Sequence, residues 1–197
     1  MGAGYYVHGS HPDWIDSAGE GAIADEIVGD LTSGLGPDRI RAGFIGEIGC
    51  SWPMTSRERR VLRAAGLAQR ATGAPLMVHP GRDPPHPTRS SRCSTTWGRI
   101  SSGRPSVTSS GPSPAPSSSS TLGRRGAWLS LDCFGLETAF YPLNPRVAMP
   151  NDGGRLALAE TVIAAGLGGR CCSPRMSARS TAWPRLVATA TTTCCAT

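Results

Sequence analysis

Two side chains that can bind a metal ion each stand at the end of a short apolar stretch. Glu47 lies in Gly-Glu-Ile-Gly-Cys-Ser-Trp-Pro (46–53), and His79 begins the sequence His-Pro-Gly-Arg (79–82). A carboxylate can bridge two neighbouring ions through its two oxygens, and a neutral imidazole is a good ligand for zinc. Paired metal ions make hydroxide available at neutral pH and polarise the bond to be broken. The two stretches therefore favour metal-dependent hydrolysis.

The same residues also have structural interpretations. A single glutamate at the end of a strand is more often an ion-pair partner than a metal ligand, and Glu47 and His79 share this ambiguity when they are considered without further context. We expect His8 and His11 to lie in a loop. Trp52 either lines a substrate pocket or packs against the edge of the fold.

The elements that must position Glu47 and His79 are a strand, a helix and a second strand. Residues 40–48 have a nearly continuous apolar middle, as expected of a strand covered on both faces, and 75–78 form a second short apolar run. Between them, Thr55 and Glu58 have the spacing of a capping box, and the helix that they begin ends at Gly73. This order predicts a βαβ unit with parallel strands.

Similar patterns occur on either side of this unit. Residues 4–7 are predicted to be the end of a strand, and apolar residues at every fourth position predict an amphipathic helix over 17–35. Further along, 127–132 alternate like a strand and 152–167 have helical spacing. Together these segments predict the α/β class.

Two segments have a different composition, 84–121 and 171–197. Thirteen of the 38 residues in 84–121 are serine and seven are proline, with no leucine, and 171–197 matches no regular element, so we expect both segments to be irregular or disordered. Neither segment contains an acidic residue, and they hold four and three arginines. Because the whole chain carries +6, the remainder carries 13 arginines against 14 acids, or −1. The net positive charge thus comes from these two segments, and few aromatic residues accompany it, so no nucleic-acid partner is expected.

Other compositional features favour a cytoplasmic protein. No apolar run reaches the length of about 18–20 residues that a membrane span needs, and no signal pattern begins the chain, so no membrane partner is expected. The seven cysteines are an odd number, which favours thiols over a disulfide framework. The adjacent pairs 171–172 and 194–195 lack the two-residue gap that is usual in zinc sites.

Five motifs together resemble the phosphotriesterase-related branch of the amidohydrolase superfamily. They are Gly-Tyr-Tyr-Val at 4–7, Ile-Gly-Glu-Ile-Gly-Cys-Ser-Trp-Pro at 45–53, His-Pro-Gly-Arg at 79–82, the segment 126–135, and Met-Pro-Asn-Asp at 149–152. The resemblance covers roughly 1–83 and 122–170. It implies an incomplete (β/α)8 TIM barrel, in which 1–83 supply about strands three to five and 122–170 about strand seven with its helix.

The resemblance also implies a role for each metal-binding side chain. Glu47 would bridge two divalent ions, usually Zn2+, and His79 would bind one of them. The implied reaction is hydrolysis of an ester, lactone, amide or phosphotriester bond of a small-molecule substrate by a metal-bound hydroxide. Other catalytic residues, substrate-binding residues and the oligomeric state stay open.

Several family ligands have no counterpart in this chain. The histidine pair of the first strand is absent, a sixth-strand histidine should fall within 84–121, where His86 comes too early, and an aspartate should follow Arg170. We interpret both odd segments as the gene read in a shifted frame. The residues 188–197 are compatible with codons that, shifted by one base, spell Gly-His-Gly-Tyr-Asp-His-Leu-Leu-Arg-His, a family-like sequence. The chain is then a defective fragment of a hydrolase; the alternative is a non-catalytic half-barrel binding protein with a basic disordered segment.

Overall fold

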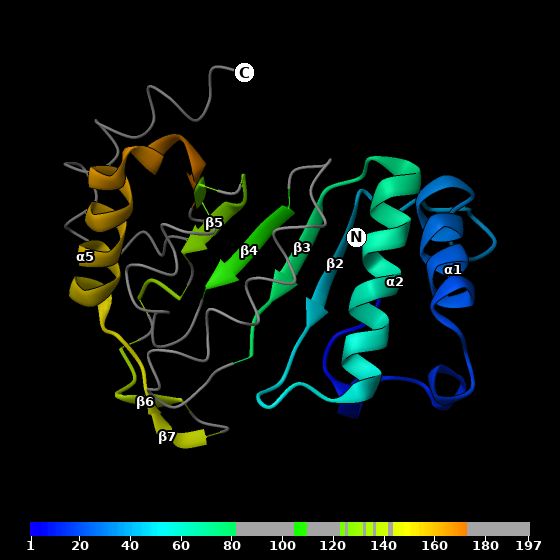
Figure 1. Cartoon of the computed structure of the whole chain (residues 1–197), viewed down its shortest axis with the longest axis horizontal. Coiled ribbons are helices and arrows are strands. Elements are labelled where there is room, and N and C mark those ends of the chain that lie inside the picture. Colours follow the sequence, from blue (N-terminus) through cyan, green and yellow to red (C-terminus); the bar gives the residue numbers. More distant parts are fainter. Residues whose placement is uncertain are drawn as a thin grey trace. The chain divides into compact units, whose positions relative to one another are not determined.

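The computed structural model describes residues 1–81, 105–109, 123–124, 126–131, 133–135, 137–141 and 144–172. The chain divides into two compact units (Figure 1). The first consists of 1–81 and 99–107, and the second of 82–98 and 108–197. Most of the two segments with unusual composition, together with His86 and the cysteine pair 194–195, lies outside the described residues.

The first unit is built on a parallel sheet. Its strands lie side by side in the order β1 (Gly2–Ala3), β2 (Phe44–Gly49), β3 (Leu76–His79) and β4 (Pro105–Ser109), and each is parallel to its neighbours. The side chains at the centre of this sheet are fully or almost fully buried: Ile45, Ile48, Leu76 and Val78. Burial of consecutive apolar residues is what parallel strands covered on both faces require.

Two helices pack against each other and against this sheet. They are α1 (Glu20–Thr32) and α2 (Ser56–Thr72), which run side by side in Figure 1. The long connection from β1 to α1 contains two short 3-10 turns, η1 (His8–Ser10) and η2 (Asp13–Asp16). The predicted βαβ unit is therefore confirmed, since β2, α2 and β3 follow one another and the two strands are parallel.

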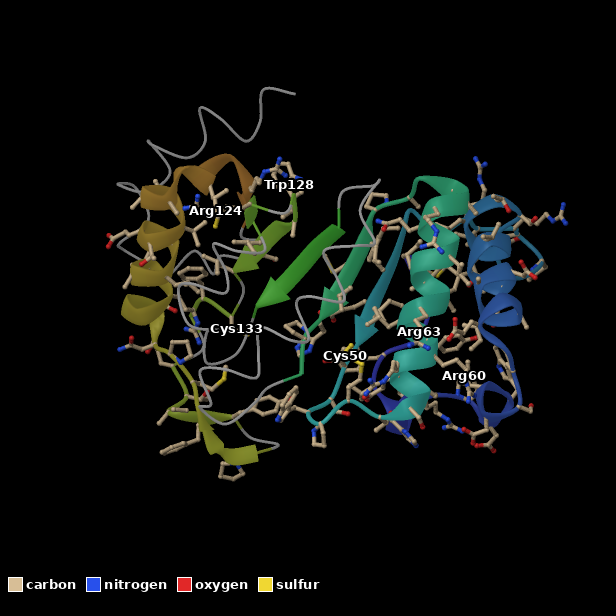
Figure 2. The ribbon with its side chains drawn as sticks, in the orientation of Figure 1. Cys50, Arg60, Arg63, Arg124, Trp128 and Cys133 are labelled. Atoms are coloured by element: carbon tan, nitrogen blue, oxygen red, sulfur yellow. The ribbon has the colours of Figure 1, made fainter. Side chains whose placement is uncertain are left out.

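The arginines of α2 hold the β1–α1 connection against the helix. Arg57 pairs with Asp16, and the Arg57 Nε donates to an Asp16 carboxylate oxygen at 2.6 Å. Arg60 donates to the backbone oxygen of Ile15 at 2.7 Å, and Arg63 pairs with Glu20 at 3.2 Å. Figure 2 shows Arg60 and Arg63 along α2.

The ends of α2 follow the sequence closely. The Thr55 hydroxyl accepts the backbone N–H of Glu58 at 3.2 Å, and the Glu58 carboxylate accepts the backbone N–H of Thr55 at 2.9 Å, which completes the capping box. The helix ends at Gly73, whose φ of 69° is left-handed. Glycine adopts this conformation at little cost, so both predicted ends are confirmed.

The second unit combines a parallel strand pair, a hairpin and a helix. β5 (Trp128–Leu131) pairs in parallel with β8 (Cys171–Cys172), and β6 (Phe140–Tyr141) pairs antiparallel with β7 (Asn144–Ala148). The helix α5 (Asp152–Val162) begins at the N-cap Asn151 and continues through η3 (Ile163–Leu167) and η4 (Gly168–Arg170). The strand and helix predicted here are confirmed.

Several predictions differ from the structure in detail. The first strand is Gly2–Ala3, just before the predicted 4–7. β4 lies inside 84–121 and β8 begins 171–197, although both segments were predicted to be irregular. A strand pairs through backbone N–H and C=O groups, so a segment poor in leucine can still form one where it meets a neighbouring strand. In the part of the chain that the structure describes, no helix is long and apolar enough to span a membrane.

Candidate metal centre

Glu47 and His79 lie at the carboxyl ends of neighbouring parallel strands. His79 is the last residue of β3, and its Cα pairs with that of Gly49, the last residue of β2. The register between β2 and β3 shifts between Ile45 and Ile48, so Glu47 lies in an irregular part of β2, two residues before Gly49. Both side chains are half-buried. The two residues thus lie toward the same edge of the sheet, on neighbouring strands.

Glycine at position 46 permits the close approach of the strands just before Glu47. Gly46 has a φ of 127°, and a Cβ built there would lie 2.4 Å from the backbone oxygen of Met77 in β3. Any other residue at this position would force β2 and β3 apart. The path of β2 that places Glu47 therefore depends on this residue.

His79 is held by the loops that follow β1 and β2. Its ring contacts that of Tyr6 edge to face, with centroids 5.5 Å apart, and its backbone oxygen accepts the N–H of Cys50 at 3.0 Å. Figure 2 shows Cys50 close to the end of β2. Tyr6 comes from the loop after β1, which was not predicted to reach His79.

His8 and His11 lie in the β1–α1 loop, as predicted, and form part of its internal structure. Their rings stack with centroids 6.2 Å apart. The His11 Nε2 is 2.7 Å from the backbone oxygen of Tyr6, so this nitrogen donates its proton to that oxygen. His11 is only 7% exposed. Its contact fixes the backbone of Tyr6, whose ring lies against His79.

A fully buried carboxylate lies behind these loops. Glu58 is 0% exposed and accepts the backbone N–H of His8 at 3.0 Å and the hydroxyl of Ser51 at 2.8 and 2.7 Å, in addition to Thr55 in the capping box. Burial alone would raise the pKa of Glu58, but these hydrogen bonds favour the ionised form and lower the pKa overall. The carboxylate is therefore ionised at neutral pH. The sequence revealed only its capping partner, because His8 is distant in the chain and Ser51 lies before the helix.

The two predicted ligands match a divalent metal in type, and they supply part of a coordination shell. A carboxylate and an imidazole are both suitable ligands, and a zinc site takes three or four from the protein. Among the residues that the structure describes, no group of three or more His, Cys, Asp or Glu side chains is arranged to hold a metal ion. Glu47 and His79 thus fit such a site as two members of a larger ligand set.

Comparison with known proteins identifies relatives over most of the chain. A model of the phosphotriesterase family matches residues 1–161. An N-acetyltaurine hydrolase from Salmo salar is 38% identical over 165 residues, which cover 82% of this chain and 46% of that protein. A phosphotriesterase-related protein from Nematostella vectensis is 36% identical over 155 residues, which cover 79% of this chain and 44% of that protein. The chain thus spans about half the length of the curated relatives it matches.

Solved structures match the fold over a similar extent. A resiniferatoxin-binding protein from Rhodobacter sphaeroides is 32% identical with a TM-score of 0.76, and the match covers 88% of this chain and 48% of that one. A phosphotriesterase homology protein from Escherichia coli, complexed with phosphate in its active site, has a TM-score of 0.74 over 94% of this chain and 66% of that one. At 20% identity, the second likeness shows the fold alone.

Proposed function

We infer a function from one premise, which is that this chain belongs to the phosphotriesterase family. We propose that the protein from which it derives is a metal-dependent hydrolase with two divalent ions, Zn2+ by preference, in a (β/α)8 barrel. The chain carries an incomplete part of that barrel. The observation that carries the proposal is the position of Glu47 and His79 at the carboxyl ends of adjacent parallel strands, where barrel enzymes of this architecture place their active sites.

In this proposal, each residue of the site has a distinct task. Glu47 would bridge both ions and His79 would bind one of them. When bound, a metal pair lowers the pKa of water so that hydroxide is available at neutral pH, and it polarises the bond to be broken. Tyr6 packs against the His79 ring, and the Cys50 N–H holds the His79 backbone. These two contacts orient the imidazole.

Among the bond types that the family hydrolyses, we place the amide first. The relatives named N-acetyltaurine hydrolase are 38% identical in Salmo salar and 34% identical in Bos taurus. The solved lactonase and organophosphorus hydrolase structures are 21% and 20% identical, so they support the fold and not the substrate. The proposed substrate is accordingly a small molecule with an N-acyl group.

We propose that this polypeptide itself is inactive. Glu47 and His79 are two ligands, and a catalytic zinc site needs at least three from the protein plus a position for water. The alternative is a non-catalytic half-barrel binding protein with a basic disordered segment.

The test uses protein made from a gene whose reading frame has been verified. We expect elemental analysis to find about two equivalents of zinc, because the bridging carboxylate would hold both ions. We also expect this protein to hydrolyse N-acetyltaurine. Glu47→Gln should lose bound metal and activity together. Glu160→Gln is the matched control, because Glu160 is an exposed glutamate of α5, and it should keep both. Folded protein without metal or activity would contradict the proposal and support the binding-protein alternative.

A further inference from the structure

The Glu58 carboxylate connects three separate parts of the first unit. It accepts the backbone N–H of Thr55 in the capping box, the backbone N–H of His8 in the loop after β1, and the hydroxyl of Ser51 in the loop after β2. A capping box requires only the contact with Thr55. The contacts with His8 and Ser51 are additional, and they join two loops to the first turn of α2.

These two loops are the ones that contact His79. From His8, the chain leads back to Tyr6, whose ring lies against the imidazole. From Ser51, it leads back to Cys50, whose N–H binds the backbone oxygen of His79. The loop after β1 also meets the end of β2, since the N–H of Gly49 donates to the backbone oxygen of Tyr5 at 3.3 Å. His8 and Ser51, which both donate to Glu58, are thus each at most two residues along the chain from a residue that contacts His79.

The geometry requires a carboxylate at this position. The backbone N–H of His8 donates to Oε1 and the backbone N–H of Thr55 donates to Oε2, so both oxygens must accept. A glutamine has the same shape, but one of its two terminal groups is an NH2 that can only donate. It would bring two donors together in a fully buried place, and one backbone N–H would lose its partner.

We propose that Glu58 is a positioning residue of the metal centre. Its carboxylate holds the loops after β1 and β2 in fixed positions relative to each other, and Tyr6 and Cys50 on those loops hold the imidazole of His79. The relevance to metal binding rests on the function proposed above, whereas the fixing of the loops does not.

Hydrogen exchange by NMR tests the fixing of the loops in the full chain. In Glu58→Gln, we expect the amides of His8 and Cys50 to exchange about tenfold faster or more relative to amides in the middle of α2, because a hydrogen bond to a charged group is lost. Ser51→Ala should accelerate Cys50 with little change in the helix. Val61→Ala is the matched control, since Val61 is a fully buried residue of the same helix and Ala at this position leaves the loop contacts intact.

A spectroscopic measurement separates positioning from a general loss of stability. The carbon-bound ring protons of His79 lie beside the Tyr6 ring, so their resonances report the contact between the rings. They should move in Glu58→Gln and stay in place in Val61→Ala. Unchanged His79 resonances in Glu58→Gln, or faster exchange spread evenly over α2 as in Val61→Ala, would overturn the proposal.

A metal titration distinguishes failure of this inference from failure of the proposed function. We expect Zn2+ to bind more weakly to Glu58→Gln than to Val61→Ala. If the protein of verified reading frame binds no zinc, the proposed metal site is wrong, while the exchange result still decides the role of Glu58. If the unaltered chain binds zinc and Glu58→Gln binds it equally well, with His79 resonances unchanged, the inference alone is wrong.

Discussion

Two glutamates of the first unit have surroundings that suit them to different tasks. Glu58 is fully buried and its carboxylate accepts hydrogen bonds from three residues, so it has little capacity left for another partner. Glu47 is half-buried at the end of β2, where a cation could reach it. A buried carboxylate whose lone pairs are satisfied stabilises structure, whereas a partly accessible one can bind a ligand.

The lowered pKa of Glu58 predicts how its contribution to stability depends on pH. A group whose pKa is lower in the folded than in the unfolded state stabilises the fold above its unfolded pKa, and this contribution is lost as the pH falls through the folded pKa. We expect Glu58→Gln to lower the free energy of unfolding by about 2 kcal/mol at pH 7, the usual value for a charged hydrogen bond. The difference should shrink below about pH 4.3, the ordinary glutamate value, and vanish in stronger acid.

Chemical denaturation at a series of pH values measures this difference. The pKa of Asp16 is also lowered, by its hydrogen bond with Arg57, so both proteins should lose some stability in acid. Subtracting the two curves removes that shared effect and isolates Glu58. A difference that stays constant from pH 7 to strong acid would show that Glu58 does not stabilise the fold through its charge.

At the level of single elements, two glycines test the backbone conformation of α1 and α2. Gly73 ends α2 with a left-handed φ of 69°, whereas Gly29 lies inside α1, where a Cβ would have no neighbouring atom within 4 Å. We expect Gly73→Ala to destabilise the protein by about 1 kcal/mol, since a side chain disfavours that conformation. Gly29→Ala should stabilise it by about 0.5–1 kcal/mol, because alanine favours the helix interior.

Thermal and chemical unfolding of both variants measure the two effects. Because the substitution is the same in each, the difference in sign comes from backbone conformation. Equal effects of Gly73→Ala and Gly29→Ala would contradict the left-handed end of α2.

Local signals explain why the βαβ unit could be predicted. A capping box, a terminal glycine and two apolar runs each act over a few residues, and all three agree on β2, α2 and β3. The short strands β4 and β8 pair with backbone that is distant in the chain, for which the sequence holds no local pattern. The hairpin of β6 and β7 pairs residues close in the chain, and it was not predicted. The predicted ends of 17–35 and 152–167 also extended beyond α1 and α5.

The same distinction applies to the candidate site. Glu47 and His79 could be placed at one edge of the sheet because they end predicted parallel strands. Tyr6 and the additional partners of Glu58 could not be predicted, since their contacts join loops whose course depends on the whole unit. Loop contacts of this kind have no periodicity in the sequence.

The whole chain combines a family match over 1–161 with a length of about half its curated relatives. Its net positive charge comes from 84–121 and 171–197, which contain seven arginines and no acidic residue. An enzyme that binds cations through carboxylates does not need such basic stretches, and the shifted-frame interpretation accounts for them. Most of both stretches lies outside the described residues, so this interpretation stays a prediction.

Sequencing the coding DNA tests the shifted frame. We expect a corrected frame to restore acidic residues in both stretches and leucine in the first, together with a histidine in the first and an aspartate in the second. The net charge should then fall from +6 toward the slightly negative value of the remainder. An intact frame that encodes 84–121 as printed would show that the basic stretches are genuine.

The central claim is that Glu47 and His79 bind the same metal centre, and a manganese titration tests it most directly. Mn2+ prefers carboxylate and imidazole ligands over thiolates, so the seven cysteines should not interfere. Electron paramagnetic resonance measures the free ion in four proteins: the unaltered chain, Glu47→Gln, His79→Asn and the control Glu160→Gln. Hydrogen exchange first shows that the α2 amides of each protein are protected, so that each one is folded. We predict weak binding that Glu47→Gln and His79→Asn each abolish and that Glu160→Gln preserves. Equal binding by all four proteins, or no binding by the folded unaltered chain, would contradict the claim.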